Sequence, residues 1–154
     1  MKKIVLVVVL AVVGLTGFGQ KSSELDLMQS VFGLEKLQVV AAYVKPGAEH
    51  KDAFIQLYDE YEVKRKEFGK ERIALIKEYA EEWDGMTNEQ ADAWMGKVLT
   101  LSTKRDKLIR TYYGKVKKAT NAKIATQFYQ VEVYILTEIR SAIFETIPFL
   151  DEGQ

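Results

Sequence analysis

The sequence predicts an all-α protein with an N-terminal signal peptide, on three observations. Apolar residues recur with the helical period of about 3.6 residues through long segments that are rich in charge. The 154-residue chain has only two prolines, at positions 46 and 148. Residues typical of helix ends stand at the breaks between the periodic segments. Together these observations predict four main helices and no β-sheet.

The N-terminus has the parts of a secretory signal peptide. Lys2 and Lys3 form a charged start, and residues 4–18 form an apolar run without charge. Gly17 and Gly19 provide the small residues that signal peptidase requires, which predicts cleavage after Gly19. A retained membrane anchor is the less favoured alternative, because the run is shorter than the roughly 20 residues that span a bilayer. We therefore expect the protein to act outside the cytoplasm.

The predicted organisation is a signal peptide at 1–19 and a single helical domain at 20–154, a length that suits one domain. The chain has no cysteine, so we expect no disulfide, no thiol catalysis, no thiolate metal ligand and no lipoprotein anchor. Basic and acidic residues number 22 each, so the overall charge indicates no class of partner.

The sequence lacks the patterns of common catalytic and metal sites. His50 is the only histidine, and it stands near Glu49 and Asp52. A tight metal site needs several convergent ligands, usually including imidazole, so we expect no metal here. No glycine-rich phosphate loop is present, and no serine has a histidine on a plausible neighbouring element. We expect a protein that is not an enzyme and has no cofactor.

The first helix should begin at Ser22 or Ser23, which are good N-caps, and end at the Lys-Pro-Gly sequence at 45–47. The second should run from about Glu49 to Trp83. At 100° per residue its apolar side chains fall on one stripe. The stripe contains Phe54, Leu57, Tyr58, Tyr61, Phe68, Leu75, Ile76, Tyr79 and Trp83.

The third helix should begin after Thr87, a good N-cap, with Gln90 completing a capping box. The fourth should start at Thr120 and stop at Pro148. The stripe of the third helix contains Ala91, Trp94, Met95, Val98, Ile109, Tyr112, Tyr113 and Val116. The stripe of the fourth contains Ile124, Phe128, Val131, Ile135, Ile139 and Ala142.

Charged residues also fall on or near these apolar stripes. Arg65, Arg72 and Arg105 lie within the stripes of the second and third helices, and Glu132 and Glu138 lie near the stripe of the fourth. One interpretation is a set of ion pairs between helices that fixes their register. The other is a polar centre on an open, partner-facing surface. We favour ion pairs, because buried charges are usually paired.

Basic residues are concentrated in one part of the chain. From Lys97 to Lys123 there are nine of them, opposed only by Asp106. With Tyr112 and Tyr113 nearby, such a stretch is compatible with nucleic-acid binding, but export argues against that partner and we expect none. Anionic lipid or acidic segments of other proteins are better candidates, and a merely solvated helix face is the alternative.

The sequence Met-Thr-Asn-Glu-Gln at 86–90 resembles the LTxxQ motif of the Spy/CpxP group of periplasmic helical proteins, with Met in place of Leu. That group typically has two copies at helix starts. Residues 119–123 (Ala-Thr-Asn-Ala-Lys) occupy the second place, with Ala for Leu and Lys for Gln. Segments 54–83 and 127–132 are also similar to secreted members of the group. The resemblance covers most of residues 49–148.

The resemblance implies a four-helix, hairpin-like chain that often forms an antiparallel homodimer in the periplasm. Members of the group include an ATP-independent chaperone that binds unfolded exported proteins, and regulators of envelope-stress sensor kinases. Metal-responsive relatives use histidine-rich sites, which this sequence lacks. The leading hypothesis is therefore chaperone-like binding of unfolded or partly folded exported proteins. The alternatives are a regulatory module that docks on an envelope-stress sensor and a structural envelope protein without clients.

The client-binding surface is expected on the third helix, where basic side chains attract acidic segments and aromatic or methionine side chains offer adaptable apolar contacts. If these apolar residues are core instead, the basic residues are only solvated. The expected client-binding residues are Trp94, Met95, Lys104, Lys107, Tyr112, Tyr113 and Lys115.

Overall fold

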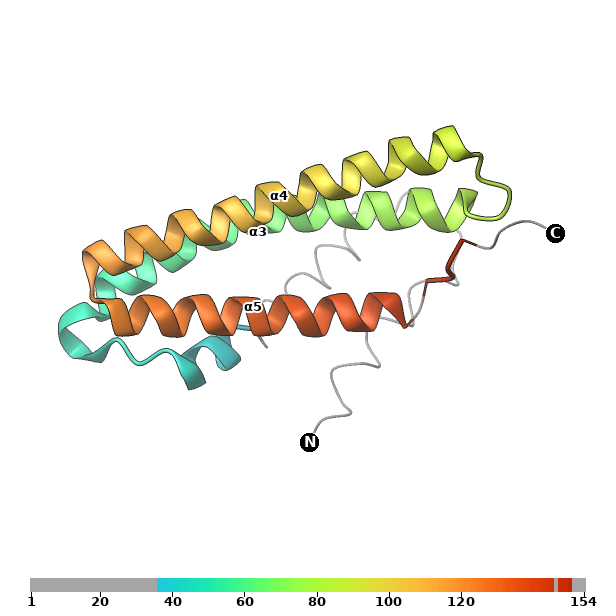
Figure 1. Ribbon diagram of the computed structural model, residues 1–154. Coiled ribbons are helices and arrows are strands. Elements are labelled where there is room, and N and C mark those ends of the chain that lie inside the picture. The colour runs from blue at the N-terminus through green and yellow to red at the C-terminus, as the bar shows by residue number, and fades with distance from the viewer. Residues whose placement is uncertain (1–35, 146, 151–154) are drawn as a thin grey trace, which may run out of the picture. The chain divides into compact units, whose positions relative to one another are not determined.

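The computed structural model describes residues 36–145 and 147–150, and the regular structure within these ranges is helical, without a strand. Residues 36–43 are helical, and three long helices follow: α3 (Gly47–Glu82), α4 (Asn88–Ala119) and α5 (Ala122–Phe144). Figure 1 shows α3, α4 and α5 running beside one another. The all-α prediction is confirmed. The signal segment, its cleavage site and the expected start of the first helix lie outside the described residues.

The ends of α3 follow the prediction. The preceding helical segment stops at residue 43, and Pro46 is the N-cap of α3. Gly47 and Gly85 both have positive φ, +68° and +95°, in the region that favours glycine. These two glycines therefore mark the turns on either side of the helix.

A capping box begins α4. The Gln90 backbone N–H donates to the Thr87 hydroxyl oxygen at 3.2 Å, and the Thr87 backbone N–H donates to the Gln90 side-chain oxygen at 2.9 Å. Two backbone donors that the helix itself cannot satisfy are thereby paired. The motif at 86–90 thus acts as a helix start.

Thr120 does not start the last helix, contrary to the sequence prediction. It is the C-cap of α4, where its backbone N–H and its hydroxyl both donate to the Val116 carbonyl, at 2.8 and 2.7 Å. Asn121 caps α5 instead, and its side-chain oxygen accepts from the Ile124 N–H at 3.0 Å. The threonine hydroxyl bonds back to the carbonyl four residues earlier, which leaves the better N-cap residue to begin α5.

Three ion pairs follow the antiparallel register of α3 and α4. Their partners are Lys97 with Glu78, Lys104 with Glu71, and Lys115 with Glu60. The lysines advance by 7 and then 11 residues along α4, and their partners retreat by the same steps along α3. These steps are close to two and three helical turns, so one side of each helix carries the whole set. Because the side chains are exposed, each pair contributes little stability.

The core is best developed where all three helices meet, around Tyr61 of α3. Its ring packs edge-on against Tyr112 of α4 at 5.5 Å and against Phe128 of α5 at 5.2 Å between centroids. Toward the α3–α4 turn the packing depends on Tyr79 and Trp94, whose centroids lie 4.6 Å apart. Between these ends, from residue 62 to residue 78, α3 has no fully buried side chain.

Among the described helices, none is both long and apolar enough to cross a lipid bilayer.

Candidate functional site

The expected client-binding residues divide between core, ion pairs and free surface. Tyr112 is only 1% exposed and belongs to the core, so its prediction as a client contact is wrong. Its side chain follows the heptad-like spacing of Ile109 and Val116, which are buried too. The physical reason is that a large aromatic ring on the inner stripe stabilises the fold most when it is removed from water.

Trp94 has a structural role as well. Its indole N–H donates to the Leu75 carbonyl at 2.9 Å, and its ring packs on Tyr79. Lys104 and Lys115 are engaged with Glu71 and Glu60. The Lys115 ammonium also lies 4.6 Å from the Tyr112 ring centroid. These four predicted residues therefore hold α4 against α3.

Met95, Lys107 and Tyr113 remain accessible. Met95 is exposed, and Lys107 is exposed with no ion pair to any described residue. Tyr113 is partly buried and packs edge-on against Tyr129 of α5, with 6.1 Å between centroids. This contact lies on the side of the molecule where α4 meets α5.

The surface of α5 carries an apolar stripe that the sequence analysis missed. The α5 stripe consists of Tyr129, Val133, Leu136 and Phe144. Their spacing of 4, 3 and 8 residues keeps them on one side of the helix. Tyr129 and Val133 are each 38% exposed, and Phe144 is 57% exposed. The sequence of α5 has apolar residues around most of the helix circumference. Because only one side of the helix packs against the core, this pattern could have predicted that some of them are exposed.

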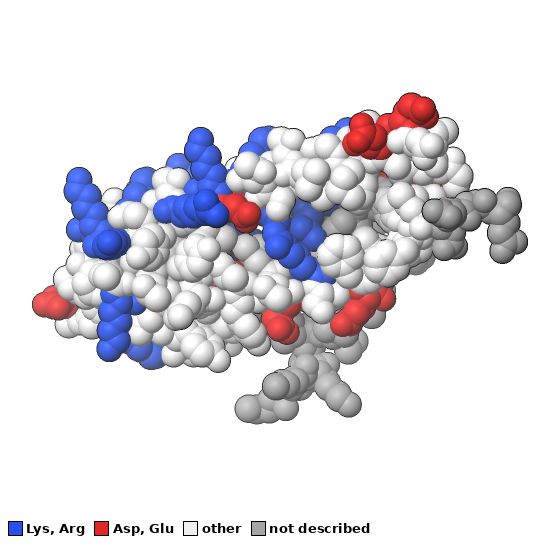
Figure 2. Space-filling view, in the orientation of Figure 1, with Lys and Arg blue, Asp and Glu red and all other residues white. Residues whose placement is uncertain are grey.

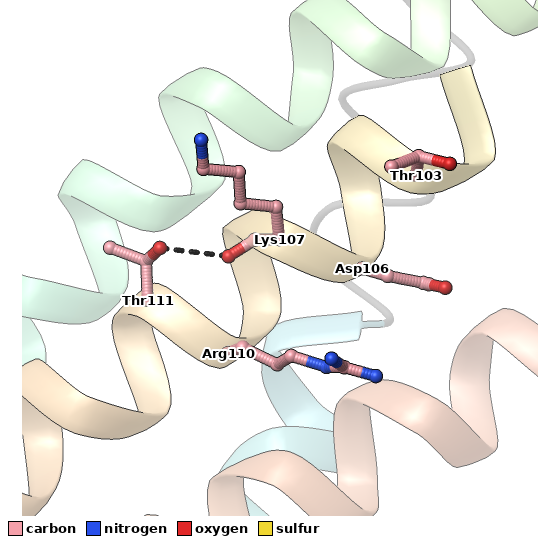
Figure 3. A pocket seen from close by; sticks show the side chains of 5 residues that line it. All are labelled: Thr103, Asp106, Lys107, Arg110 and Thr111. Atoms are coloured by element: carbon pink, nitrogen blue, oxygen red, sulfur yellow. Dashed lines mark hydrogen bonds between the residues drawn. The ribbon is translucent and has the colours of Figure 1, made fainter. Parts of the chain in front are cut away.

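Basic residues of α4 without ion pairs to the described residues are also exposed. Figure 3 shows a shallow depression on α4 lined by Thr103, Asp106, Lys107, Arg110 and Thr111, with Arg110 pointing toward α5 and Lys107 pointing away from it. Further along the chain, Lys117, Lys118 and Lys123 are exposed too. Figure 2 shows the basic side chains gathered mainly over α4 on this face. We call the α5 stripe together with Lys107 and Arg110 the α4–α5 face.

The arginines do not form the expected ion pairs between helices. Arg65 pairs with Glu62, one turn earlier on α3, at 2.7 Å. Among the described residues no ion pair within 4 Å joins Arg65, Arg72 or Arg105 to Glu132 or Glu138. Burial lowers the pKa of Arg65, but its hydrogen bond to Glu62 and the charges of Glu62 and Glu132 raise it overall, so Glu132 still acts on Arg65 across the helices. Sequence spacing identifies residues on the same helix face but does not determine which helix supplies the nearer partner, and Glu62 is within reach on α3 itself.

Glu132 is buried and accepts a hydrogen bond of 2.7 Å from the Tyr61 hydroxyl. Glu138 is exposed on α5. Glu132 therefore lies in the core, as its position near the apolar stripe suggested, and the Tyr61 hydroxyl donates to it.

Arg72, Arg105 and Arg140 come together from α3, α4 and α5, and we call them the arginine cluster. Arg105 is 8% exposed. One terminal nitrogen of Arg105 and one of Arg140 both lie 3.4 Å from the Ser102 hydroxyl oxygen. The Nε atoms of Arg72 and Arg105 are buried and have no hydrogen-bond partner among the residues that the structure describes. Arg140 was not predicted from the sequence; it lies four residues after Leu136, on the same side of α5 as the α5 stripe.

Burial and the mutual repulsion of the arginines lower the pKa of two members of the cluster. Burial lowers the pKa of Arg72 to about 10, with further lowering by the charges of Arg105 and Arg140. Burial and the Arg140 charge also lower the pKa of Arg105, and the charge of Asp106 partly opposes this shift. Among the described residues no carboxylate forms an ion pair with any of the three. The arrangement therefore concentrates positive charge where solvation is reduced.

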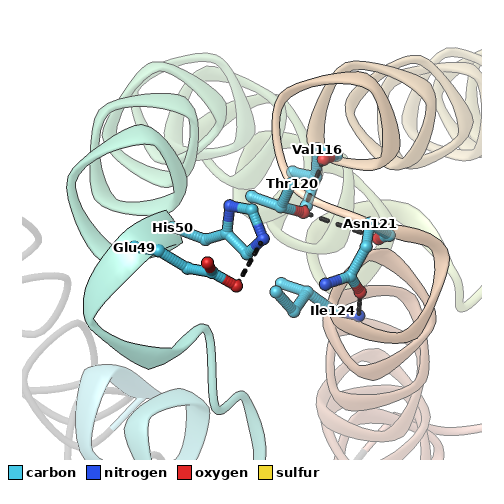
Figure 4. A network of polar contacts seen from close by, with 6 residues as sticks. All are labelled: Glu49, His50, Val116, Thr120, Asn121 and Ile124. Carbon is cyan, nitrogen blue, oxygen red and sulfur yellow. Dashed lines mark hydrogen bonds and ion pairs between the residues drawn. The ribbon is translucent and has the colours of Figure 1, made fainter.

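The only histidine takes no part in either feature. His50 lies 3.2 Å from Glu49, at the start of α3, and Figure 4 shows its ring directed toward the junction of α4 and α5. The described residues contain no group of three or more side chains suited to hold a metal ion.

No protein-family model, curated protein or solved structure matches this chain. The resemblance to the Spy/CpxP group therefore remains a prediction from its motif.

Proposed function

We propose that this protein is a periplasmic, ATP-independent chaperone that binds non-native segments of exported proteins on the α4–α5 face. It acts by equilibrium binding, without catalysis or a cofactor, and arrives in the periplasm after removal of residues 1–19. A Spy/CpxP-like four-helix, hairpin-like chain, with a homodimer as its working form, belongs to the same proposal.

One observation carries the proposal: α5 exposes an apolar stripe, and the neighbouring helix α4 exposes basic side chains that have no ion pair within the described structure. Non-native chains expose apolar side chains, so they gain from contact with Tyr129, Val133 and Phe144. Lys107 and Arg110 attract acidic segments over longer distances and raise the rate of encounter. The face differs from the one expected from sequence, because Tyr112 is core and Lys104 and Lys115 are engaged with α3.

A matched pair of valines provides the test. Val133 lies on the α5 stripe, whereas Val63 is 66% exposed on α3. We expect Val133→Thr to weaken binding of a fluorescently labelled, reduced and unfolded client, and Val63→Thr to leave it unchanged. Fluorescence anisotropy measures both affinities, and thermal unfolding checks that both variants fold. Equal effects of the two changes would rule out the α4–α5 face.

The charge contribution is tested separately. Lys107→Glu with Arg110→Glu should slow association and reduce its dependence on salt, because screening acts mainly on exposed charges. Lys51→Glu with Lys77→Glu, two exposed changes on α3, is the control. If the protein binds no unfolded client but binds one folded sensor domain tightly, the regulatory-module alternative replaces the chaperone proposal.

A further inference from the structure

The arginine cluster has an electrostatic feature that the proposed function leaves unexplained. Three positive charges from three helices converge, and Arg105 is more than nine-tenths buried. Unpaired buried charges are costly, and proteins usually neutralise them with an ion pair or a bound ion. The described residues supply no ion pair to Arg72, Arg105 or Arg140. The described residues thus bring together hydrogen-bond donors and positive charge without a negatively charged acceptor.

Ser102 adds a further donor at the same place. Its hydroxyl oxygen is within 3.4 Å of both Arg105 and Arg140, and these contacts use its two acceptor positions. Its hydroxyl hydrogen is then left to donate. The Nε–H groups of Arg72 and Arg105 are buried and have no acceptor within the described part of the chain. An oxyanion beside Ser102 would accept from the terminal nitrogens of Arg105 and Arg140, and its charge would offset those of all three arginines.

We propose that the arginine cluster and Ser102 bind one small tetrahedral oxyanion, of the phosphate or sulfate type, between α3, α4 and α5. Guanidinium groups are well suited to such ions, because they donate in a fixed planar fork and remain charged. One guanidinium can bind both oxygens of a planar carboxylate. Three arginines from separate helices instead suit a tetrahedral ion, whose oxygens point in several directions. Figure 2 shows basic side chains within the recess between α4 and α5.

The burial of Arg105 favours a free ion over a carboxylate carried by a client chain. A side chain of a bound polypeptide would have to bring its backbone close to a site of which Arg105 is only 8% exposed. A free oxyanion has no such attachment. The proposal is therefore independent of client binding, and either can fail without the other.

Binding of the ion should stabilise the folded protein, because the unfolded chain has no assembled site. We expect the thermal unfolding midpoint of the purified protein to rise by several degrees in inorganic phosphate at about 100 times the dissociation constant, relative to chloride at equal ionic strength and pH. Titration calorimetry should give one phosphate per chain.

Arg105→Met and Arg140→Met should both abolish this phosphate-specific rise. In chloride, Arg105→Met should unfold at a higher temperature than the parent, since it removes an unpaired buried charge and keeps an apolar side chain of similar length. Arg110→Met is the matched control: it changes an exposed arginine of the same helix and should keep the full response to phosphate.

Three results would overturn the proposal. The first is equal stability in phosphate and chloride. The second is a phosphate response that persists in both Arg105→Met and Arg140→Met, which would mean a non-specific salt effect. The third is stabilisation by an acidic peptide, dependent on Arg105, with none by phosphate, which would assign the cluster to a client carboxylate.

Discussion

The Tyr61 hydroxyl donates a 2.7 Å hydrogen bond to the Glu132 carboxylate, and this contact joins α3 to α5 inside the core. Both residues are almost completely buried. Tyr61 also packs against Tyr112 of α4, so one side chain connects the three helices. A buried carboxylate requires such donors, and Tyr61 therefore combines aromatic packing with solvation of charge.

Replacing Tyr61 with Phe should lower the free energy of unfolding by roughly 1.5–3 kcal/mol, the usual range for a hydrogen bond to a charged group. Urea denaturation at neutral pH measures the change. Tyr134→Phe is the control, because Tyr134 is exposed on α5 and has no described hydrogen bond to protein. If both variants lose the same stability, the hydroxyl of Tyr61 is not the source of the effect.

Stability should fall as the pH rises above about 10, the ordinary pKa of tyrosine. Burial, with the negative charges of Glu62 and Glu132, raises the pKa of Tyr58 and Tyr61 well above that value in the folded protein. The unfolded chain then loses protons that the folded chain keeps, so rising pH favours unfolding. Their contribution is complete below the unfolded pKa and is lost above it.

Denaturation curves between pH 8 and pH 11 measure this dependence, and tyrosinate absorbance reports ionisation directly. Tyr58→Phe should flatten the decline above pH 10. The lowered pKa of Arg72, about 10, acts in the opposite direction, because the folded protein releases that proton before the unfolded chain does. An unchanged slope in Tyr58→Phe would show that Tyr58 ionises normally in the folded state.

Replacing Thr87 with Ala should cost about 1 kcal/mol, because it removes one half of the capping box. Thr126→Ala is the matched control within α5, where the hydroxyl only bonds back to the Ala122 carbonyl. That change should be neutral or slightly stabilising, since alanine has the higher helix propensity. Thermal unfolding compares the two. Equal losses would mean that the cap contributes nothing specific to α4.

Asn121→Ala tests the reassigned start of α5. It should cost about 1 kcal/mol by removing the acceptor for the Ile124 N–H. Chemical denaturation gives the change in the free energy of unfolding. The control is Asn88→Ala, which changes an exposed asparagine at the first position of α4. A smaller loss at Asn121 than at Asn88 would contradict its role as the cap.

The helix ends were predictable where one residue type decides the local geometry. Pro46 and Thr87 act through their own backbone or side-chain chemistry, so the sequence was sufficient there. Thr120 was harder, because threonine serves either as an N-cap or by bonding back to an earlier carbonyl, and its neighbour Asn121 competes for the same role.

The site depended on packing between helices, which periodicity does not determine. Tyr112 and Tyr113 are adjacent in sequence, yet one is core and the other lies at the α4–α5 face. The ion pairs of Lys104 and Lys115 require the α3–α4 register, which becomes visible only in the folded arrangement. Arg140 likewise joins the arginine cluster only because α5 lies beside α4 at Ser102.

The most direct test of the chaperone proposal is suppression of aggregation without nucleotide. Light scattering would follow several unrelated proteins as they are reduced or diluted from denaturant, with this protein present at an equimolar ratio. We predict that it delays aggregation of most of them, and that Val133→Thr acts less well than Val63→Thr. Failure of the parent protein to delay aggregation of any of these clients would contradict the proposed function.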